Sequence, residues 1–337
     1  MSIVRLSGLL LLLVLGQPAH GALNGALSGA WFDPAFEGAG FLVEVLPEDR
    51  AVVYWFTYDD RGGQQWYVGV GESTDETIVI AELQVARGAA FGPDFDPDQV
   101  ERRSVGTLEI AFASCTAAIA RFEVDGVAGE QALGRLTTIR GRPCASVTDD
   151  GTTAAALNQS ASWFAEDRSG EGFIVQLLEG DSAFVNWFTF DAAGAPAWYT
   201  GIASVAGQSV VIADLLATRG GRFGPDHDPA AVVRTPAGRL ELYLGCSDGR
   251  VAYDMTNGLP SGFHGLTRLT TLAGLGCEED SYTVPPIEAL IGTWRSAGFG
   301  LYAAVNEATA TIFEVTAVSC LPVIEAPTPG LAAGLVG

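Results

Sequence analysis

Residues 51–71 read AVVYWFTYDDRGGQQWYVGVG, and residues 183–203 read AFVNWFTFDAAGAPAWYTGIA. The tryptophans of the two stretches align at one offset of 132 residues, Trp55 with Trp187 and Trp66 with Trp198. A constant offset over a gapless stretch indicates an internal repeat. We therefore expect two copies of one domain, with everything else in the chain placed relative to them.

Short segments rich in Val, Ile, Phe, Tyr and Thr, each bounded by Gly, Asp or Pro, follow one another through the first copy. They are typical of β-strands, and no stretch has a sustained helical period. We expect strands at Trp31 and at residues 41–46, 51–59, 65–71, 77–85, 106–113, 117–124 and 131–139. Eight sequential strands predict an up-and-down barrel, because closure removes exposed edges. The predicted fold class is all-β, with two tandem eight-stranded antiparallel barrels, β-sandwiches as the alternative, and a short partial β segment at the C-terminus.

The ends of the chain differ from the repeats. Arg5, the apolar run at residues 9–15 and the small residues before position 22 are typical of a secretory signal, so we expect a periplasmic or secreted protein. No later apolar stretch is long enough for a transmembrane helix. The predicted division is a signal peptide at 1–22, barrel repeats at 23–144 and 161–277 joined by a linker at 145–160, a partial third module at 278–324 and a disordered tail at 325–337.

The charge is strongly acidic, with 40 Asp and Glu against 18 basic residues, all of them Arg, for a net charge of −22. This balance argues against nucleic acid as a partner. Without Lys, neither Schiff-base catalysis nor a phosphate-binding P-loop is available.

Cysteine spacing agrees with export. Cys115 and Cys144 are 29 residues apart in the first copy, and Cys246 and Cys277 are 31 apart at matching places in the second. We expect one disulfide in each copy, stabilising it by about 3 to 4 kcal/mol on the chain-entropy model. Cys320 is left over.

The repeat also selects candidate ligand-binding residues. Positions 53, 55, 57 and 59 are identical in the second copy, whereas Tyr54 and Tyr58 on the opposite face become Asn186 and Phe190, which indicates that the identical face is the interior. Two interpretations stay open: these side chains line a ligand cavity, or they fill the core. The candidate ligand-binding residues are Trp55, Thr57, Asp59, Trp66, Tyr67, Trp187, Thr189, Asp191, Trp198 and Tyr199.

Two charged patterns favour structural roles over chemistry. Asp94, Asp96 and Asp98 have calcium-loop spacing but lack the Gly and Glu that such a loop needs at its sixth and twelfth positions, so we expect a rigid Asp-capped turn. Arg87 and Glu109, retained as Arg219 and Glu241, are expected to form ion pairs across the barrel mouths, with recognition of an acidic or sugar hydroxyl group as the alternative.

No complete set of candidate catalytic residues occurs in both copies. Glu44 and Glu109 form a conceivable glycosidase pair, but the second copy has Gln176 in place of Glu44. His227 and His264 have no counterpart in the first copy, and no GxSxG motif accompanies them. We expect no catalytic residues, no metal site and no cofactor.

Gly29-Ala30-Trp31 and Arg135 resemble the calycin signature, in which an Arg packs across a Trp at the closed end of an eight-stranded barrel. The resemblance, to the family of lipocalins and avidins, implies structural stacks of Trp31 with Arg135 and of Trp163 with Arg268, although Ala161 replaces the Gly in the second copy. The whole repeat also resembles tandem-repeat proteins exported by proteobacteria, which imply no activity. Residues 294–322 resemble the leading module of some tail-specific serine peptidases.

The function expected from these observations is an exported, non-catalytic protein that holds a small apolar or sugar-like ligand in its barrels. The alternatives are an envelope scaffold with filled barrels that contacts other proteins, and an accessory part of a secreted hydrolase. The partner is accordingly an unidentified small molecule or an envelope protein.

Overall fold

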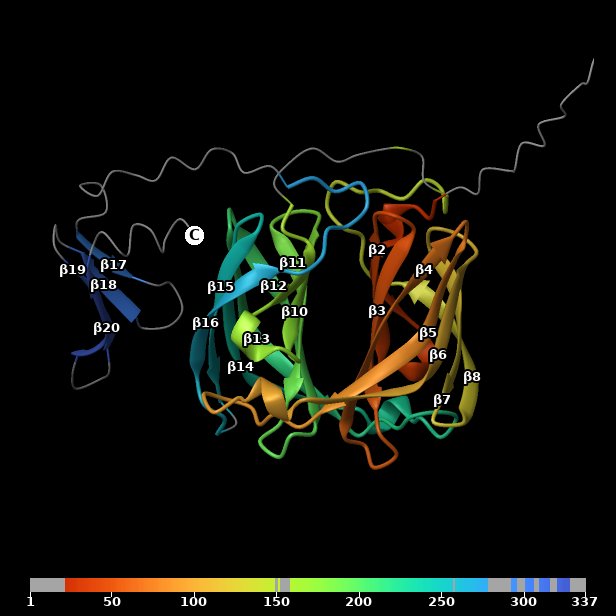
Figure 1. Cartoon of the computed structure of the whole chain (residues 1–337), viewed down its shortest axis with the longest axis horizontal. Coiled ribbons are helices and arrows are strands. Elements are labelled where there is room, and N and C mark those ends of the chain that lie inside the picture. The colour runs from red at the N-terminus through yellow and green to blue at the C-terminus, as the bar shows by residue number, and fades with distance from the viewer. Residues whose placement is uncertain are drawn as a thin grey trace, which may run out of the picture.

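The computed structural model describes residues 22–148, 151, 158–256 and 258–277, together with the backbone of four strands between residues 292 and 327. The predicted signal peptide up to residue 21, half of the linker and the segments between the last four strands lie outside the described residues. The chain forms two closed antiparallel barrels of eight strands each, side by side (Figure 1). The predicted all-β tandem-barrel fold is confirmed, and the sandwich alternative is wrong.

Each strand pairs with the next in sequence, and the first strand closes the barrel against the last. Barrel 1 consists of β1 (Gly29–Phe32), β2 (Gly40–Leu46), β3 (Arg50–Tyr58), β4 (Gln64–Thr74), β5 (Thr77–Arg87), β6 (Glu101–Phe112), β7 (Ala117–Val124) and β8 (Val127–Arg135). Barrel 2 consists of β9 (Ala161–Phe164), β10 (Gly172–Leu178), β11 (Ser182–Phe190), β12 (Pro196–Ala206), β13 (Ser209–Arg219), β14 (Val233–Leu244), β15 (Asp248–Met255) and β16 (Gly262–Arg268).

The expected last strand of the first copy, at residues 131–139, is placed four residues too late. β8 begins at Val127, directly after a two-residue turn formed by Asp125 and Gly126, whose φ angles are +49° and +80°. Positive φ at both turn positions gives the twist that a tight hairpin needs, and Asp-Gly is a preferred sequence for it. The turn pairs Val124 with Val127 and so sets the register of the hairpin.

Apolar side chains on both faces of several strands have two different destinations. The inward faces form a separate core in each barrel. The outward faces of β2 to β4 and of β10 to β12 form a third apolar cluster, in which the two barrels pack against each other. Tyr54 and Phe188 meet there with ring centroids 5.2 Å apart. The barrels are therefore packed as one unit and not merely linked.

Helices are restricted to short 3-10 turns in the described part of the chain: η1 (Gly25–Leu27), η2 (Pro34–Phe36), η3 (Pro97–Gln99), η4 (Glu166–Arg168) and η5 (Pro229–Ala231). Asp96 caps η3 by accepting a hydrogen bond from the Asp98 amide, and Asp228 caps η5 in the same way. The prediction of rigid Asp-capped turns is thus confirmed.

Both predicted disulfides are present, between Cys115 and Cys144 and between Cys246 and Cys277. Each bond joins a segment beyond the last strand of its barrel to the β6–β7 or β14–β15 turn. Among the described residues, none belongs to a helix of the length and apolarity needed to cross a membrane.

Four further strands form a sheet in sequence order: β17 (Gly292–Arg295), β18 (Leu301–Val305), β19 (Thr309–Val315) and β20 (Cys320–Pro327). This sheet is the expected short partial β segment at the C-terminus. β20 extends to Pro327 and therefore overlaps the first residues of the predicted tail.

Candidate functional site

Trp55 lies at the centre of barrel 1 and is only 1% exposed. Its ring stacks on Phe41 at a centroid distance of 4.9 Å and contacts Phe122 at 4.7 Å and Tyr67 at 5.5 Å. Rings in such contact exclude water and contribute beyond their buried area. The candidates Trp55 and Tyr67 therefore fill the barrel interior with aromatic packing.

Trp187 occupies the equivalent place in barrel 2 and is fully buried. It stacks on Phe173 at 5.1 Å and contacts Tyr253 at 4.7 Å and Tyr199 at 5.5 Å. The two barrels thus contain the same aromatic arrangement, as the identical residues of the repeat predict. The indole N–H groups of Trp55 and Trp187 have no hydrogen-bond partner among the described residues.

Trp66 and Trp198 do not join Trp55 and Trp187, so a cavity lined by all four tryptophans is wrong. Trp66 pairs across the ladder with Phe56, the neighbour of Trp55, and so points to the opposite face of the sheet. Trp66 and Trp198 belong to the apolar cluster between the barrels. There the Trp66 indole donates a hydrogen bond to the Thr189 carbonyl at 3.0 Å. Their role is to join the barrels.

The remaining candidates lie at the ends of the central hairpins. Asp59 accepts hydrogen bonds from the amides of Arg61 and Gly63, at 2.8 and 2.7 Å. Asp191 closes the matching turn of the second copy, accepting from the amides of residues 193 and 195. The two Asp side chains are therefore turn formers. Thr57 and Thr189 are buried.

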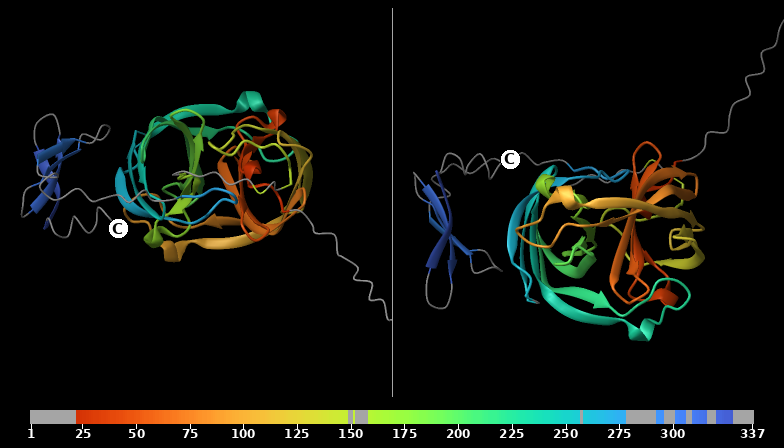
Figure 2. Two further views of the ribbon diagram at one scale, coloured as in Figure 1. Left: turned by 90° about the horizontal axis from the view of Figure 1, so that it is seen from above. Right: turned by 60° about the horizontal axis from the view of Figure 1, so that its bottom comes forward.

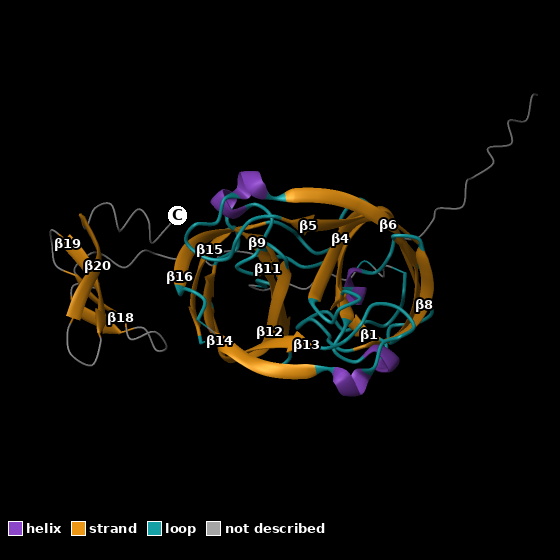
Figure 3. Ribbon diagram, turned by 90° about the horizontal axis from the view of Figure 1, so that it is seen from below, coloured by secondary structure: helices purple, strands orange, loops and turns teal. Residues whose placement is uncertain are grey.

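The barrels exchange their longest loops, which we call the plug loops: residues 88–100 between β5 and β6, and residues 220–232 between β13 and β14. Each loop crosses to the other barrel, on opposite sides of the molecule (Figures 2 and 3). At the crossing points the Gly88 amide donates to the Gly194 carbonyl and the Gly220 amide to the Gly62 carbonyl, both at 3.0 Å. The mouth of each barrel is covered by the other repeat.

Each plug loop inserts a phenylalanine into the aromatic centre of the opposite barrel. Phe223 contacts Trp55 at 5.4 Å, Phe122 at 5.7 Å and Tyr67 at 6.1 Å. Phe91 contacts Trp187 at 5.3 Å in the other direction and is counted in the core of barrel 2. These phenylalanines begin the Phe-Gly-Pro sequence that both copies share.

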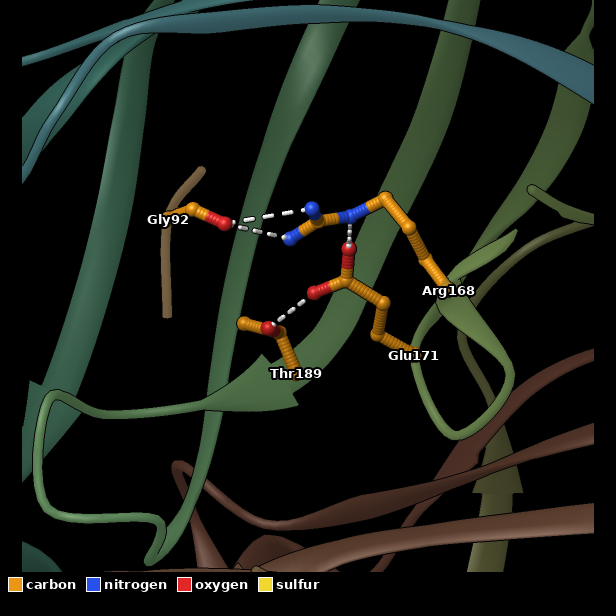
Figure 4. A network of polar contacts seen from close by, with 4 residues as sticks. All are labelled: Gly92, Arg168, Glu171 and Thr189. Carbon is orange, nitrogen blue, oxygen red and sulfur yellow. Dashed lines mark hydrogen bonds and ion pairs between the residues drawn. The ribbon is translucent and has the colours of Figure 1, made fainter. Parts of the chain in front are cut away.

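Barrel 2 adds a buried polar network around its plug (Figure 4). Arg168 forms an ion pair with Glu171, and Glu171 accepts a second hydrogen bond from the Thr189 hydroxyl. Both terminal nitrogens of Arg168 donate to the Gly92 carbonyl at 3.1 Å. Burial raises the pKa of Glu171, while Arg168 and Thr189 act in the opposite direction. The network thus ties the inserted loop to the barrel that receives it.

Barrel 1 lacks this network. At the common offset, Phe36 stands in place of Arg168 and Ala39 in place of Glu171. The guanidinium of Arg168 lies 4.4 Å from the ring of Phe95, whereas the ring of Phe36 faces His227, the counterpart of Phe95, at 5.3 Å. Barrel 2 therefore holds its plug by a buried ion pair and aromatic contact. Barrel 1 uses aromatic contact together with exposed polar contacts to Glu37, whose carbonyl lies 3.2 Å from His227 Nε2 and whose carboxylate pairs with Arg234.

His264 is a further titratable side chain inside barrel 2. Its ring lies 5.9 Å from that of Tyr253 and 6.2 Å from that of Phe173. Burial, with a smaller contribution from the positive charge of Arg168, lowers the pKa of His264 to about 4. The imidazole is therefore neutral at pH 7.

Glu44 is buried between the barrels, 2% exposed, and does not face Glu109, which lies on the exposed surface in an ion pair with Arg121. The Ser162 hydroxyl of the other repeat donates to Glu44 at 2.9 Å. Burial raises the pKa of Glu44 to about 7, against the opposing effects of its hydrogen bonds and of Arg268. A glycosidase pair of Glu44 with Glu109 is excluded by this placement.

The expected ion pair of Arg87 with Glu109 is wrong. Along the β5–β6 ladder Arg87 is opposite Glu101, whereas Glu109 is opposite Val79, eight residues away on the same strand. Arg87 instead donates to the Gln65 side chain at 3.4 Å. A strand of this length cannot bring its two ends together.

The Trp–Arg stacks implied by the resemblance are present. The Arg135 guanidinium lies 5.6 Å from the Trp31 ring, and that of Arg268 lies 5.9 Å from the Trp163 ring. Arg135 donates to the carbonyls of Ala26, Ser28 and Thr137, and burial lowers its pKa to about 10. Its contacts are with the chain itself, in a structural role.

Four residues that hold the exchanged loops were not predicted from the sequence: Phe91, Phe223, Arg168 and Glu171. The retained Phe-Gly-Pro sequence was an available signal, since a turn conserves an aromatic side chain between copies only where that side chain is used. Arg168 and Glu171 gave no such signal, because they occur in one copy only.

Truncating the inserted ring tests how much the exchange stabilises the fold. We expect Phe91→Ala to lower the free energy of unfolding by about 3 kcal/mol, because it leaves a cavity against Trp187. Phe223→Ala should cost less, since Phe223 is only partly buried. Urea unfolding measures both. Phe263→Ala is the control, because Phe263 is 58% exposed; a Phe91→Ala loss no larger than that of the control would contradict the packing role.

Comparison of the chain with models of protein families, with curated proteins and with solved structures finds no match.

Proposed function

We propose that this chain is an exported, non-catalytic interaction scaffold: two filled, calycin-like barrels joined as one rigid unit that contacts other proteins. The observation that carries the proposal is the filling of each barrel by its own aromatic rings and by the phenylalanine of the opposite repeat. With the mouths covered in this way, a partner contacts the outer surface or displaces a plug loop. The two disulfides support export, and the two Trp–Arg stacks support the calycin-like assignment.

A second candidate is the binding of a small apolar or sugar-like ligand within the barrels. One specific observation favours it: the buried indole N–H groups of Trp55 and Trp187 have no partner among the described residues. An unsatisfied buried donor is costly, by about 1 to 3 kcal/mol, and an acceptor on a ligand would remove that cost. The filling by Phe91 and Phe223 weighs against this candidate. The hydrolase alternative depended on residues 294–322, of which the structure describes only the backbone of the strands β17 to β20.

The two candidates differ in how the intact protein responds to small molecules. We expect no saturable change in tryptophan fluorescence, and a melting temperature constant within about 1 °C, when the mature protein is titrated with fatty acids, aromatic metabolites, glycans and calcium. A saturable response that disappears in a folded Trp55→Phe or Trp187→Phe variant would reject the filled scaffold and support ligand binding. Trp294→Phe is the matched control, because Trp294 lies in the separate sheet of β17 to β20.

A further inference from the structure

The plug position of barrel 2 contacts three chemically distinct parts of the inserted segment. The ring of Phe91 lies against Trp187, Tyr253 and Tyr199, at 5.3, 5.7 and 6.4 Å. The Phe91 amide donates to the Asp191 carbonyl at 3.2 Å. Barrel 2 therefore recognises an aromatic side chain together with the backbone that carries it.

The third contact is to the next peptide unit. Both terminal nitrogens of Arg168 donate to the Gly92 carbonyl, and its Nε is held by Glu171. Because Glu171 already balances the charge of Arg168, the site is suited to a neutral amide oxygen more than to a second carboxylate. The charge balance favours a peptide over an aromatic acid.

The glycine after the phenylalanine is also required. Gly92 has a φ of +113°, and a Cβ added there would lie 2.6 Å from Pro260 Cγ. A side chain at this position would be strained in its backbone conformation and crowded by Pro260. The segment that fits is thus an aromatic residue followed by Gly.

We propose that the mouth of barrel 2 is a peptide-recognition site for a Phe-Gly segment, occupied within this chain by Phe91 and Gly92 as an internal ligand. A Phe-Gly segment of another polypeptide takes the same position when the plug loop is displaced. The site is defined by Arg168, Asp191, Trp187, Tyr199 and Tyr253. It rests on the proposed function in that it names the partner chemistry of a scaffold that works through polypeptide contacts.

Barrel 1 provides the internal comparison. It receives Phe223 against the same kind of aromatic centre. However, Phe36 and Ala39 replace Arg168, which donates to the following carbonyl in barrel 2, and Glu171, which holds Arg168. It should therefore bind an aromatic ring with little preference for the attached peptide. The specificity of barrel 2 lies in the Arg168 contact.

The test uses the full mature chain carrying Phe91→Ala and a blocked peptide of residues 88–97, GAAFGPDFDP. We expect saturable binding by calorimetry, a change in tryptophan fluorescence and partial recovery of the melting temperature. The same peptide with Ala in place of the phenylalanine that corresponds to Phe91 should not bind. Affinity should fall at least tenfold when Arg168→Phe and Glu171→Ala are added, which gives barrel 2 the residues of barrel 1. Affinity for the peptide should be similarly weak in the matched Phe223→Ala chain, in which the truncated ring is the one inserted into barrel 1. If Phe91→Ala does not fold, the Phe91→Leu chain is used in its place. The peptide then binds by displacing the Leu side chain from the barrel.

Three results would overturn the proposal. They are a folded Phe91→Ala chain that does not bind the peptide, equal affinity for the peptide with Ala at the Phe91 position, and tighter binding of 3-phenylpropionate than of the peptide. The last would indicate a site for aromatic acids. Each of these results leaves the small-molecule titration of the intact protein unchanged, so failure of this inference is distinguishable from failure of the scaffold function.

Discussion

Replacing Glu44 by Gln is expected to make the protein more stable at alkaline pH and to leave it nearly unchanged in acid. The folded protein raises the pKa of Glu44 from 4.5 to about 7, so the folded state favours the protonated carboxyl. Its stabilising contribution is complete below pH 4.5 and is lost as the pH rises through 7. A pKa difference of this size corresponds to about 3 kcal/mol. The free energy of unfolding of Glu44→Gln minus that of the natural protein should therefore grow by about 3 kcal/mol between pH 4.5 and pH 8.

Taking this difference removes the effect of the other titrating groups. His264 acts in the opposite direction over a similar range, because its lowered folded pKa of about 4 costs stability as the pH falls below 6.5. The groups that share the surroundings of Glu44 are Ser162, Thr270, Tyr54 and Arg268. Denaturant unfolding at several pH values measures the effect. An unchanged difference across this range would show that Glu44 is ionised in the folded protein without cost.

The matched control is Gln176, which occupies the place of Glu44 in the second copy. It is buried between the barrels and accepts a hydrogen bond from the Thr137 hydroxyl at 2.6 Å. Gln176→Glu should introduce the same pH dependence with the opposite sign relative to the natural protein, lowering stability above pH 7. The pair of variants separates the burial of a carboxyl from any effect peculiar to position 44.

Removing Glu171 alone is expected to cost about 3 to 5 kcal/mol of unfolding free energy. Glu171→Ala leaves the buried guanidinium of Arg168 without its counter-ion, and an uncompensated charge in the interior is strongly destabilising. The double variant Arg168→Phe with Glu171→Ala should recover most of the loss, because it removes both charges and installs the residues that barrel 1 uses at the same places.

Urea unfolding of the two single variants and the double variant forms a complete cycle. The expected coupling between the two sites is large, since the residues form one ion pair. A double variant as unstable as Glu171→Ala would mean that the hydrogen bonds to Gly92 and Thr189, and not the charge balance, account for the stability of the network.

Much of the fold follows from local patterns. The repeat at an offset of 132 residues and the alternation that places Trp55 and Trp187 inside are visible when the two copies are compared, and the cysteine spacings are visible within each copy. A strand's two faces are set by a period of two, and a disulfide by the distance between segments that the same hairpins bring together. The number of strands in each barrel was predictable for this reason. The start of β8 was predicted four residues too late, although Asp125-Gly126 is a strong turn signal directly before it.

The candidate site was predicted only in part, because the sequence cannot say which copy a side chain contacts. Trp66 bonds to Thr189, 123 residues away, and Ser162 to Glu44, 118 residues away. The insertion of Phe91 and Phe223 into opposite barrels likewise depends on how two complete barrels pack.

Two disulfide-bonded barrels with aromatic interiors follow from the amino-acid sequence, since period, repeat and spacing are properties of the chain. The filling of these interiors by exchanged loops, the hold of Arg168 and Glu171 on one loop and the burial of Glu44 between the barrels are visible only in the folded protein. These features arise from contacts between surfaces that exist only after each barrel has closed.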